Sequence, residues 1–210
     1  MPNFYELKKA DDVSLESDTS QAFSVTDEAL VCEFKAGNVE AFELLLNRYK
    51  KRIFKYIYFQ IDQHSDAEDL TQEVFLQLYQ KAQNYRQESN LSSFIYAIAK
   101  HVVFNYFRTK SRMLKEVNSK QSTNDHIDDT HNTVAPEQNS IQQAKQDLLT
   151  KALLQLNTEE RQLIYLSDKE GFSYIQMSHI LDVKIGTVRS RLNTARKKLL
   201  TYIRDRSHEL

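Results

Sequence analysis

The scarcity of residues that break helices is the feature that most constrains how this chain folds. Only three Gly and two Pro occur among its 210 residues, so few positions demand a turn. Leu, Gln, Lys and Glu, which favour helices, are plentiful. We therefore expect an all-α protein without a β-sheet.

A long polar segment divides the chain into two helical domains. Ser, Thr, Asn, Asp and Gln are frequent from residue 117 onward and no helical period is sustained there, which is typical of a flexible linker. We expect a flexible acidic tail over 1–24, a helical domain over 25–116, the linker over 117–146 and a second helical domain over 147–210.

The formal net charge of −1 hides a segregation of charge along the chain. Residues 1–29 carry −5 and residues 117–147 carry −3, whereas residues 30–116 carry +3 and residues 148–210 carry +4. Two positive blocks separated by negative segments suggest two modules that bind anions.

Other classes of protein are disfavoured by composition. The single cysteine, Cys32, excludes an intrachain disulfide and a zinc site made of cysteines, and we expect neither a metal nor a cofactor. No apolar run is long enough to span a membrane, and the N-terminus lacks the order of a signal peptide. We therefore expect a cytoplasmic protein that does not insert into a membrane.

A helix with an acidic face is predicted from Ser65 to Ala82. Ser65 and Glu68 stand three residues apart, as in a capping box, where each side chain accepts a hydrogen bond from the other's backbone N–H. The apolar residues at helical spacing are expected to face inward: Ala67, Leu70, Val74, Leu78 and Ala82. The opposite stripe is then acidic and exposed: Asp66, Asp69 and Glu73.

The next helix, predicted from Leu91 to Arg112, combines cations with aromatic rings. Its inward residues are Ile95, Ile98, Ala99, Val102 and Tyr106. The other residues lack carboxylates and include Tyr96, Lys100, His101, Phe104, Phe107, Arg108, Lys110 and Arg112. Cations neutralise phosphates and rings stack on exposed bases, typically for ~1–3 kcal/mol per base, so this face suits single strands. The alternative is that some of these rings belong to the core.

The second domain has the pattern of a helix-turn-helix. Acidic residues follow Asn157, as at a helix start, and Gly171 is placed to end that helix. Ser173 and Gln176 form a second capping box for a short helix, and a longer helix is expected after Asp182, from about Lys184 to Arg204.

The longer helix presents a basic surface that fits a DNA groove. Its inward face is predicted to hold Ile185, Val188, Leu192, Ala195, Leu199 and Ile203. The outward and flanking residues include no acid: Thr187, Arg189, Ser190, Arg191, Asn193, Thr194, Arg196, Lys197 and Lys198. A helix enters the major groove of B-DNA, where Arg, Ser, Thr and Asn reach bases and phosphates. The alternative is a helix that is merely solvated by its Lys and Arg residues.

Together the two blocks resemble the sigma factors of bacterial RNA polymerase, in particular the extracytoplasmic-function (ECF) group of the sigma-70 family. The strings that carry the resemblance are "DAEDLTQEVFLQLY", "SSFIYAIAKHVVFNYFRTKSR" and "LNTEERQLIYLSDKEGFSYIQMSHILDVKIGTVRSRLNTARKKL". Two motifs in the right order and at the right separation are more specific than either alone. The resemblance implies that the first domain is sigma region 2 and the second is region 4.

The resemblance also implies partners and roles. Region 2 would dock on the β′ clamp helices of core polymerase through Asp66, Asp69, Gln72 and Glu73. It would capture the melted −10 strand of promoter DNA through Phe94, Lys100, His101, Phe104, Asn105, Arg108 and Arg112. Region 4 would contact the β flap and read the −35 duplex through Lys184, Thr187, Arg189, Ser190, Arg191, Asn193, Thr194, Lys197 and Lys198. An anti-sigma factor is a further expected partner.

Several positions depart from the usual pattern of the family. Phe94 stands where Trp is common, and His101 replaces the usual Asn, which changes the hydrogen bonds offered to bases. Asp182 replaces a frequent Gly in the turn, Lys184 replaces an N-capping Ser, and Thr194 stands where Arg is common.

Two other functional classes give different readings of the same residues. An enzyme would use the carboxylates of residues 66–73 as a metal cluster, but that helix offers no His at a matching spacing. A helix-turn-helix regulator that is not a sigma subunit would not need a cationic and aromatic helix beside an acidic docking stripe. A sigma factor accounts for both features, so we do not expect an enzyme.

Overall fold

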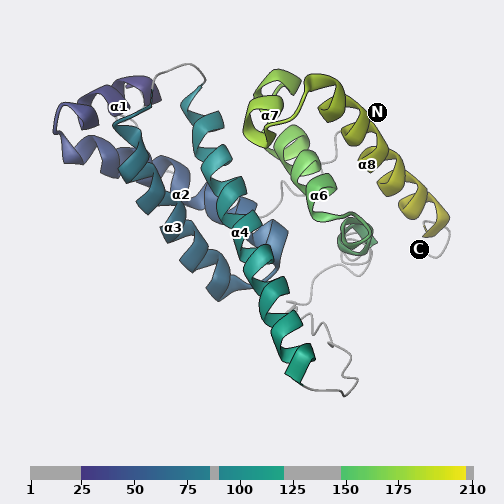
Figure 1. The fold of residues 1–210 in the computed structure, drawn as a ribbon. Coiled ribbons are helices and arrows are strands. Elements are labelled where there is room, and N and C mark those ends of the chain that lie inside the picture. Colours follow the sequence, from purple (N-terminus) through teal and green to yellow (C-terminus); the bar gives the residue numbers. More distant parts are fainter. Residues whose placement is uncertain (1–24, 86–89, 121–147, 207–210) are drawn as a thin grey trace, which may run out of the picture.

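A computed structural model describes residues 25–85, 90–120 and 148–206, and every regular element in these ranges is helical (Figure 1). The N-terminal bundle consists of α1 (Asp27–Lys35), α2 (Val39–Ile61), α3 (His64–Ala82) and α4 (Leu91–Lys120). The C-terminal bundle consists of a helix over 148–154, α6 (Thr158–Ile164), the π-helix η3 (Tyr165–Lys169), α7 (Tyr174–Leu181) and α8 (Ile185–Arg206). The all-α fold with two small helical domains is confirmed.

The N-terminal bundle is built around α2, which contacts α1, α3 and α4. Ile53 and Ile57 of α2 are completely buried, because apolar residues recur along one face of this helix. The predicted inward residues of α3 and α4 are buried as well, except for Leu70 and Tyr106, which are half-buried.

The start of α3 differs from the prediction. The helix begins at His64 after Gln63, which makes no capping hydrogen bond with its side chain, so Ser65 lies inside the first turn. The reason is the tight connection from α2, in which Asp62 adopts a left-handed conformation (φ 54°). This turn, and not the predicted pair of Ser65 and Glu68, decides where α3 begins.

The helix starts of the C-terminal bundle agree with the prediction. Asn157 and Glu160 form a capping box, with N···O distances of 2.9 and 3.1 Å. Ser173 and Gln176 form another before α7, with distances of 2.9 and 3.3 Å. Asp182 ends α7 in a left-handed conformation (φ 55°), which Asp adopts more readily than most residues other than Gly.

The longer helix of the predicted helix-turn-helix packs as expected over most of its length. Val188, Leu192, Ala195 and Leu199 of α8 are buried. Ile185, predicted to face inward, is exposed instead, because it lies in the first turn of α8, beyond the edge of the bundle core.

Helix α4 continues to Lys120, so the chain is still helical at the start of the range predicted as the linker. The rest of that range, and the predicted tail over 1–24, lie outside the described residues.

The two bundles pack against each other, which the sequence did not indicate. Helix α4 contacts α7, and α2 contacts α6 (Figure 1). Tyr96, which was placed on the outer cationic face of α4, is fully buried because it packs on Phe172 of the C-terminal bundle. The buried residues of both bundles thus form one continuous apolar cluster.

Candidate nucleic-acid interface

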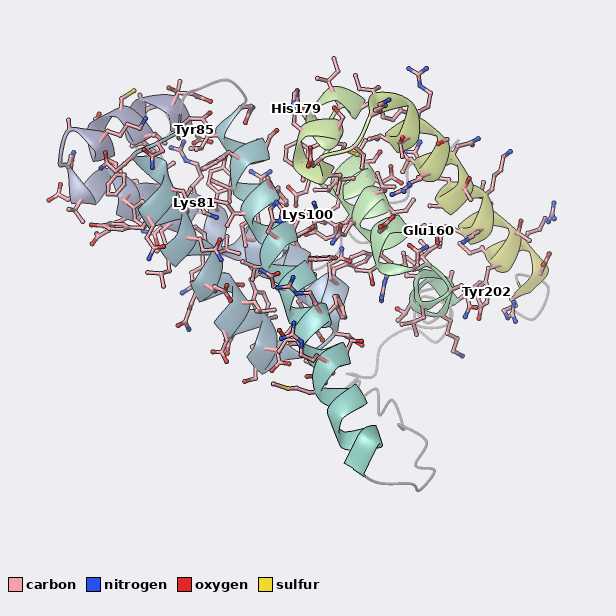
Figure 2. All side chains as sticks on the ribbon, in the orientation of Figure 1. Lys81, Tyr85, Lys100, Glu160, His179 and Tyr202 are labelled. Atoms are coloured by element: carbon pink, nitrogen blue, oxygen red, sulfur yellow. The ribbon has the colours of Figure 1, made fainter. Side chains whose placement is uncertain are left out.

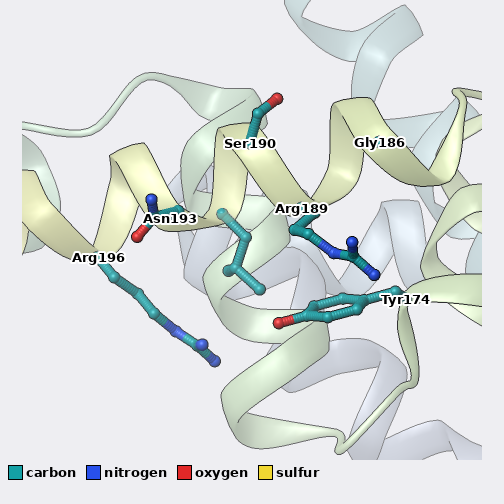
Figure 3. Close-up of a pocket in the computed structure, with 7 residues that line it drawn as sticks. Tyr174, Gly186, Arg189, Ser190, Asn193 and Arg196 are labelled. Carbon is teal, nitrogen blue, oxygen red and sulfur yellow. The ribbon is translucent and has the colours of Figure 1, made fainter.

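The outer face of α8 carries an open group of polar side chains. Arg189, Ser190 and Asn193 are exposed and line a shallow pocket together with Gly186 and Arg196 (Figure 3). Tyr174, the first residue of α7, completes this pocket from the neighbouring helix. Donors and acceptors of this kind are suited to base edges and phosphates.

Tyr174 was missed by the sequence prediction, although its position directly after the Ser173 cap places it at the exposed start of α7. Its ring centroid lies 5.7 Å from Cζ of Arg189, within the range of a cation–π contact. The ring therefore supports the guanidinium from below while leaving it open to a ligand (Figure 3).

The other predicted residues of α8 occupy different surroundings. Arg191 pairs with Glu159, and Lys198 pairs with Glu160 at 2.6 Å, so both point toward α6. Arg196 binds Asp168 and donates to Ser167 Oγ at 2.9 Å. Both members of the Arg191–Glu159 pair are exposed, and exposed ion pairs contribute about 0–1 kcal/mol, so Arg191 could exchange its carboxylate partner for a phosphate. The remaining predicted residues stay exposed, apart from the half-buried Thr187: Lys184, Thr194 and Lys197.

The cationic and aromatic face of α4 is exposed between residues 101 and 112, around the middle of the helix. His101, Phe104, Asn105, Arg108 and Arg112 follow one another at intervals of one to four residues and are all exposed, with Phe104 at 58%. We call these five residues the α4 stripe. A large ring that remains this exposed beside cations can stack on a base.

The other two residues predicted for this surface lie elsewhere. Phe94 is half-buried, and its ring packs 5.1 Å from that of Tyr85. Lys100 is also half-buried, and its Nζ donates to the carbonyl oxygen of Leu181 at 3.3 Å. Figure 2 shows Lys100 on the side of α4 that faces the C-terminal bundle.

His101 lies in an environment that favours the neutral imidazole. Partial burial lowers its pKa below the ordinary 6.5, and the charges of Lys100 and Lys81 lower it further, while Asp182 acts in the opposite direction. At neutral pH this side chain therefore offers one donor and one acceptor.

The acidic face of α3 is narrower than predicted. Asp69, Gln72 and Glu73 are exposed, whereas Asp66 is half-buried and accepts a hydrogen bond from the hydroxyl of Tyr106 at 2.6 Å. Burial and this hydrogen bond raise the pKa of Tyr106 to about 12. Asp66 thus links α3 to α4.

An apolar side chain that the prediction missed lies within the acidic face. Leu76 is 59% exposed and follows Gln72 by four residues and Glu73 by three, so it shares their side of α3. The helical spacing already indicated this position, since Leu76 falls outside the inward set.

Residues 45–113 match the family model of sigma-70 region 2, and residues 146–199 match the model of sigma-70 region 4. The chain is 28% identical over 184 residues to the ECF RNA polymerase sigma-E factor of Haemophilus influenzae, which covers 85% of this chain and 95% of the relative. It is 26% identical over 178 residues to the sigma-E factor of Escherichia coli K12, covering 83% and 93%. The chain belongs to the ECF group of the sigma-70 family.

Two solved structures share the fold of this chain. The sigma factor RpoE of Bartonella quintana, solved with the anti-sigma factor NepR, has a TM-score of 0.60 at 22% identity and covers 78% of this chain and 96% of its own. CnrH, solved with the cytosolic domain of CnrY, has a TM-score of 0.62 at 17% identity, covering 85% and 97%.

The family decides between the two DNA-binding classes considered for this sequence. Both sigma regions occur in their family order, so a helix-turn-helix regulator that is not a sigma subunit is not favoured. In the described ranges, no three His, Cys, Asp or Glu side chains gather as metal ligands, including those of α3. None of the helices in the same ranges is long and apolar enough to cross a membrane.

Proposed function

We propose that this ECF sigma factor binds core RNA polymerase and directs promoter-specific initiation, with region 4 reading the −35 duplex and region 2 capturing the melted −10 strand. The carrying observation is that two chemically different surfaces lie on separate bundles: the polar outer face of α8 and the α4 stripe. The first suits a groove, and the second suits unstacked bases.

The −35 surface centres on Arg189, Ser190 and Asn193. An arginine held at one end by a ring is well placed to pair with a guanine, and the neighbouring hydroxyl and amide can reach adjacent bases. Lys184 and Lys197 are exposed beside them and supply charge for phosphates. The cations that pair with α6 and η3 would contribute less.

The −10 surface is the α4 stripe. Phe104 provides an exposed ring for stacking, and Asn105 and His101 would provide hydrogen bonds to base edges. Arg108 and Arg112 are exposed further along the helix and would bind backbone phosphates. His101 would read bases as a neutral group, because its pKa is lowered by burial and by the nearby lysines.

Polymerase would dock on Asp69, Gln72 and Glu73, with Leu76 as the apolar centre of the contact. The buried core of an interface is more apolar than its polar rim, and charges at the rim steer association. The structure does not favour an equal role for Asp66, since its carboxylate is engaged by Tyr106. The β′ clamp helices are the expected partner of this face, and the β flap that of region 4.

An anti-sigma factor is a further proposed partner, since the sigma factor RpoE, which shares the fold, is described in complex with the anti-sigma factor NepR. As a polymerase subunit the chain would act in the cytoplasm, and chemistry would be left to the polymerase. Reconstitution tests this function: purified core polymerase and a promoter library should yield specific run-off transcripts only when the chain is added. Specific transcripts without the chain, or none with it, would contradict the assignment.

A further inference from the structure

One face of α2 carries exposed cations beside a cluster of aromatic rings. Lys51, Lys55 and Tyr58 follow one another at intervals of four and three residues, so they share one side of the helix, and all three are exposed. The ring of Phe54 is stacked with that of Tyr58 at a centroid distance of 5.9 Å. His64 of α3 approaches these two rings, at 5.1 and 6.2 Å. We call these five residues the α2 surface.

The two lysines of the α2 surface have no partner for their charge. Within residues 25–85, 90–120 and 148–206, neither Lys51 nor Lys55 forms an ion pair or a side-chain hydrogen bond. Glu68, a carboxylate beside this surface, lies 3.7 Å from Nδ1 of His64. Tyr58 is 40% exposed, so the rings are also partly uncovered. Uncovered cations and rings of this kind suit a ligand that combines negative charge with apolar groups.

The described part of the chain begins beside the α2 surface. Arg48, which precedes the first lysine of that surface by three residues, lies on the same side of α2. Its guanidinium donates to the carbonyl oxygen of Val25 at 3.2 Å and pairs with Asp27. The hydroxyl of Tyr49 binds Asp27 as well. These contacts fix the point at which residues 1–24 join the N-terminal bundle.

The acidic tail, residues 1–24, has a composition that complements the α2 surface. It contains five Asp or Glu and two Lys. Four of the acids fall within residues 11–18, "DDVSLESD", and Val13 and Leu15 stand among them. Carboxylates match the unpaired lysines, and apolar side chains match the partly uncovered rings.

The acidic tail is also long enough to reach this surface. Seven residues separate Asp18 from Val25, and an extended chain of that length spans at most about 25 Å. Along α2, Tyr58 lies only about 15 Å from Arg48, at about 1.5 Å per residue. A segment tethered by a short linker acts at an effective concentration of about millimolar, which favours it over a partner free in solution.

We propose that the acidic tail docks on the α2 surface of its own chain, with carboxylates of residues 11–18 on Lys51 and Lys55 and an apolar side chain of that segment against the rings of Phe54 and Tyr58. This contact goes beyond the proposed function, since it requires neither polymerase nor promoter DNA. The docked tail covers a cationic and aromatic face on which a single strand of nucleic acid would also bind. It therefore keeps nonspecific strands off this side of region 2.

Paramagnetic relaxation enhancement in the free full-length chain tests the contact. A nitroxide is attached to Ser14→Cys in a Cys32→Ser background, since Cys32 is the only cysteine. We expect the backbone amide signals of residues 51–58 to lose about half of their intensity or more, and those of α8, a second basic helix, to lose little. Broadening at α8 instead of α2, or at neither helix, would overturn the proposal.

Charge variants separate docking from the mere proximity of the tail. Lys51→Glu with Lys55→Glu should restore most of the lost signal, because the tail is then repelled. Lys50→Glu with Lys81→Glu is the matched control: both lysines are exposed outside the α2 surface, so the broadening should persist. Circular dichroism confirms that each variant keeps its helices. Equal broadening in the original chain and in Lys51→Glu with Lys55→Glu would reflect tethering alone and would refute docking.

A single-stranded oligonucleotide separates the tail from the rival occupant of the α2 surface. Neutralising the tail with Asp11→Asn, Asp12→Asn and Glu16→Gln should raise affinity of the full-length chain for a labelled thymidine strand by about threefold. Adding Lys51→Glu with Lys55→Glu should cancel this gain. If these two lysines already carry strand binding in the original chain, and neutralising the tail changes nothing, nucleic acid occupies the surface and the proposal is wrong.

Discussion

Tyr174 supports Arg189 across the turn of the helix-turn-helix, with 5.7 Å between the ring centroid and Cζ of the guanidinium. The contact joins the first residue of α7 to the outer face of α8 and gives a flexible side chain a preferred direction. Because of this contact, mutation of Tyr174 should affect the site as mutation of Arg189 does.

Replacing Tyr174 by Leu should weaken binding of −35 duplex DNA by about two- to fivefold, because an exposed cation–π contact contributes about 0.5–1 kcal/mol. Tyr174→Phe keeps the ring and should bind as the original does. Fluorescence anisotropy with a labelled duplex measures both variants. An equal loss of affinity in Tyr174→Leu and Tyr174→Phe would assign the effect to the hydroxyl. Unchanged affinity in Tyr174→Leu would show that Tyr174 is not part of the site.

Arg189 and Arg191 should differ although both are basic residues of the same helix. Arg189→Ala should cost about 1–3 kcal/mol and relax preference at one or two base pairs. Arg191→Ala should cost less than about 1 kcal/mol without changing preference, because this arginine pairs with Glu159. Binding to a set of single-base variants of the duplex distinguishes them, and a larger effect at Arg191 would mean that the ion pair breaks on DNA.

The acidic face of α3 should respond to charge reversal at its centre. Asp69→Lys with Glu73→Lys should weaken binding to core polymerase at least tenfold and leave the melting temperature nearly unchanged, since both side chains are exposed. Leu76→Ala should weaken it without altering its salt dependence. Asp66→Asn is the matched control, which should lower stability through Tyr106 more than it lowers polymerase binding. Unchanged affinity of the reversed variant would move the docking site elsewhere.

His101 should titrate below 6.5 in the folded protein, because burial and the charges of Lys100 and Lys81 disfavour the imidazolium. Since its folded-state pKa is lowered, the associated stability is present above the unfolded value of about 6.5 and is lost as pH falls through the folded-state pKa. NMR titration of the imidazole measures the midpoint. Lys81→Gln should raise it toward 6.5, and an unshifted midpoint in both proteins would refute this environment.

The helices and their inward faces could be predicted because they depend on neighbouring residues. Asn157 and Ser173 cap helices through partners three residues away, and this local pattern predicted both helix starts correctly. The prediction that Ser65 caps α3 was wrong, because it used the local pattern alone. The turn at Asp62 places the start of the helix earlier, at His64. A periodic pattern identifies what is buried but not what buries it.

The contact between the bundles could not be predicted from the sequence. Arg52 of α2 and Glu170, which follows η3, form an ion pair across the bundles although they lie 118 positions apart. Tyr96 fits a base-stacking ring or a core ring equally well, and only its contact with Phe172 decides the matter. Asp66 is a similar case. Its spacing matches the acidic stripe, but its carboxylate accepts a hydrogen bond from Tyr106 of α4 and is half-buried.

The division of labour between the two DNA surfaces is tested most directly by permanganate detection of strand opening, with holoenzyme assembled from core polymerase and this chain. Phe104→Ala is compared with Arg189→Ala on a duplex promoter and on one whose −10 region is already mismatched open. We predict that Phe104→Ala abolishes most opening on the duplex and regains much of its transcription on the open template, while Arg189→Ala is impaired at −35 attachment on both. Equal impairment of Phe104→Ala on the two templates would contradict a role of the α4 stripe in strand opening.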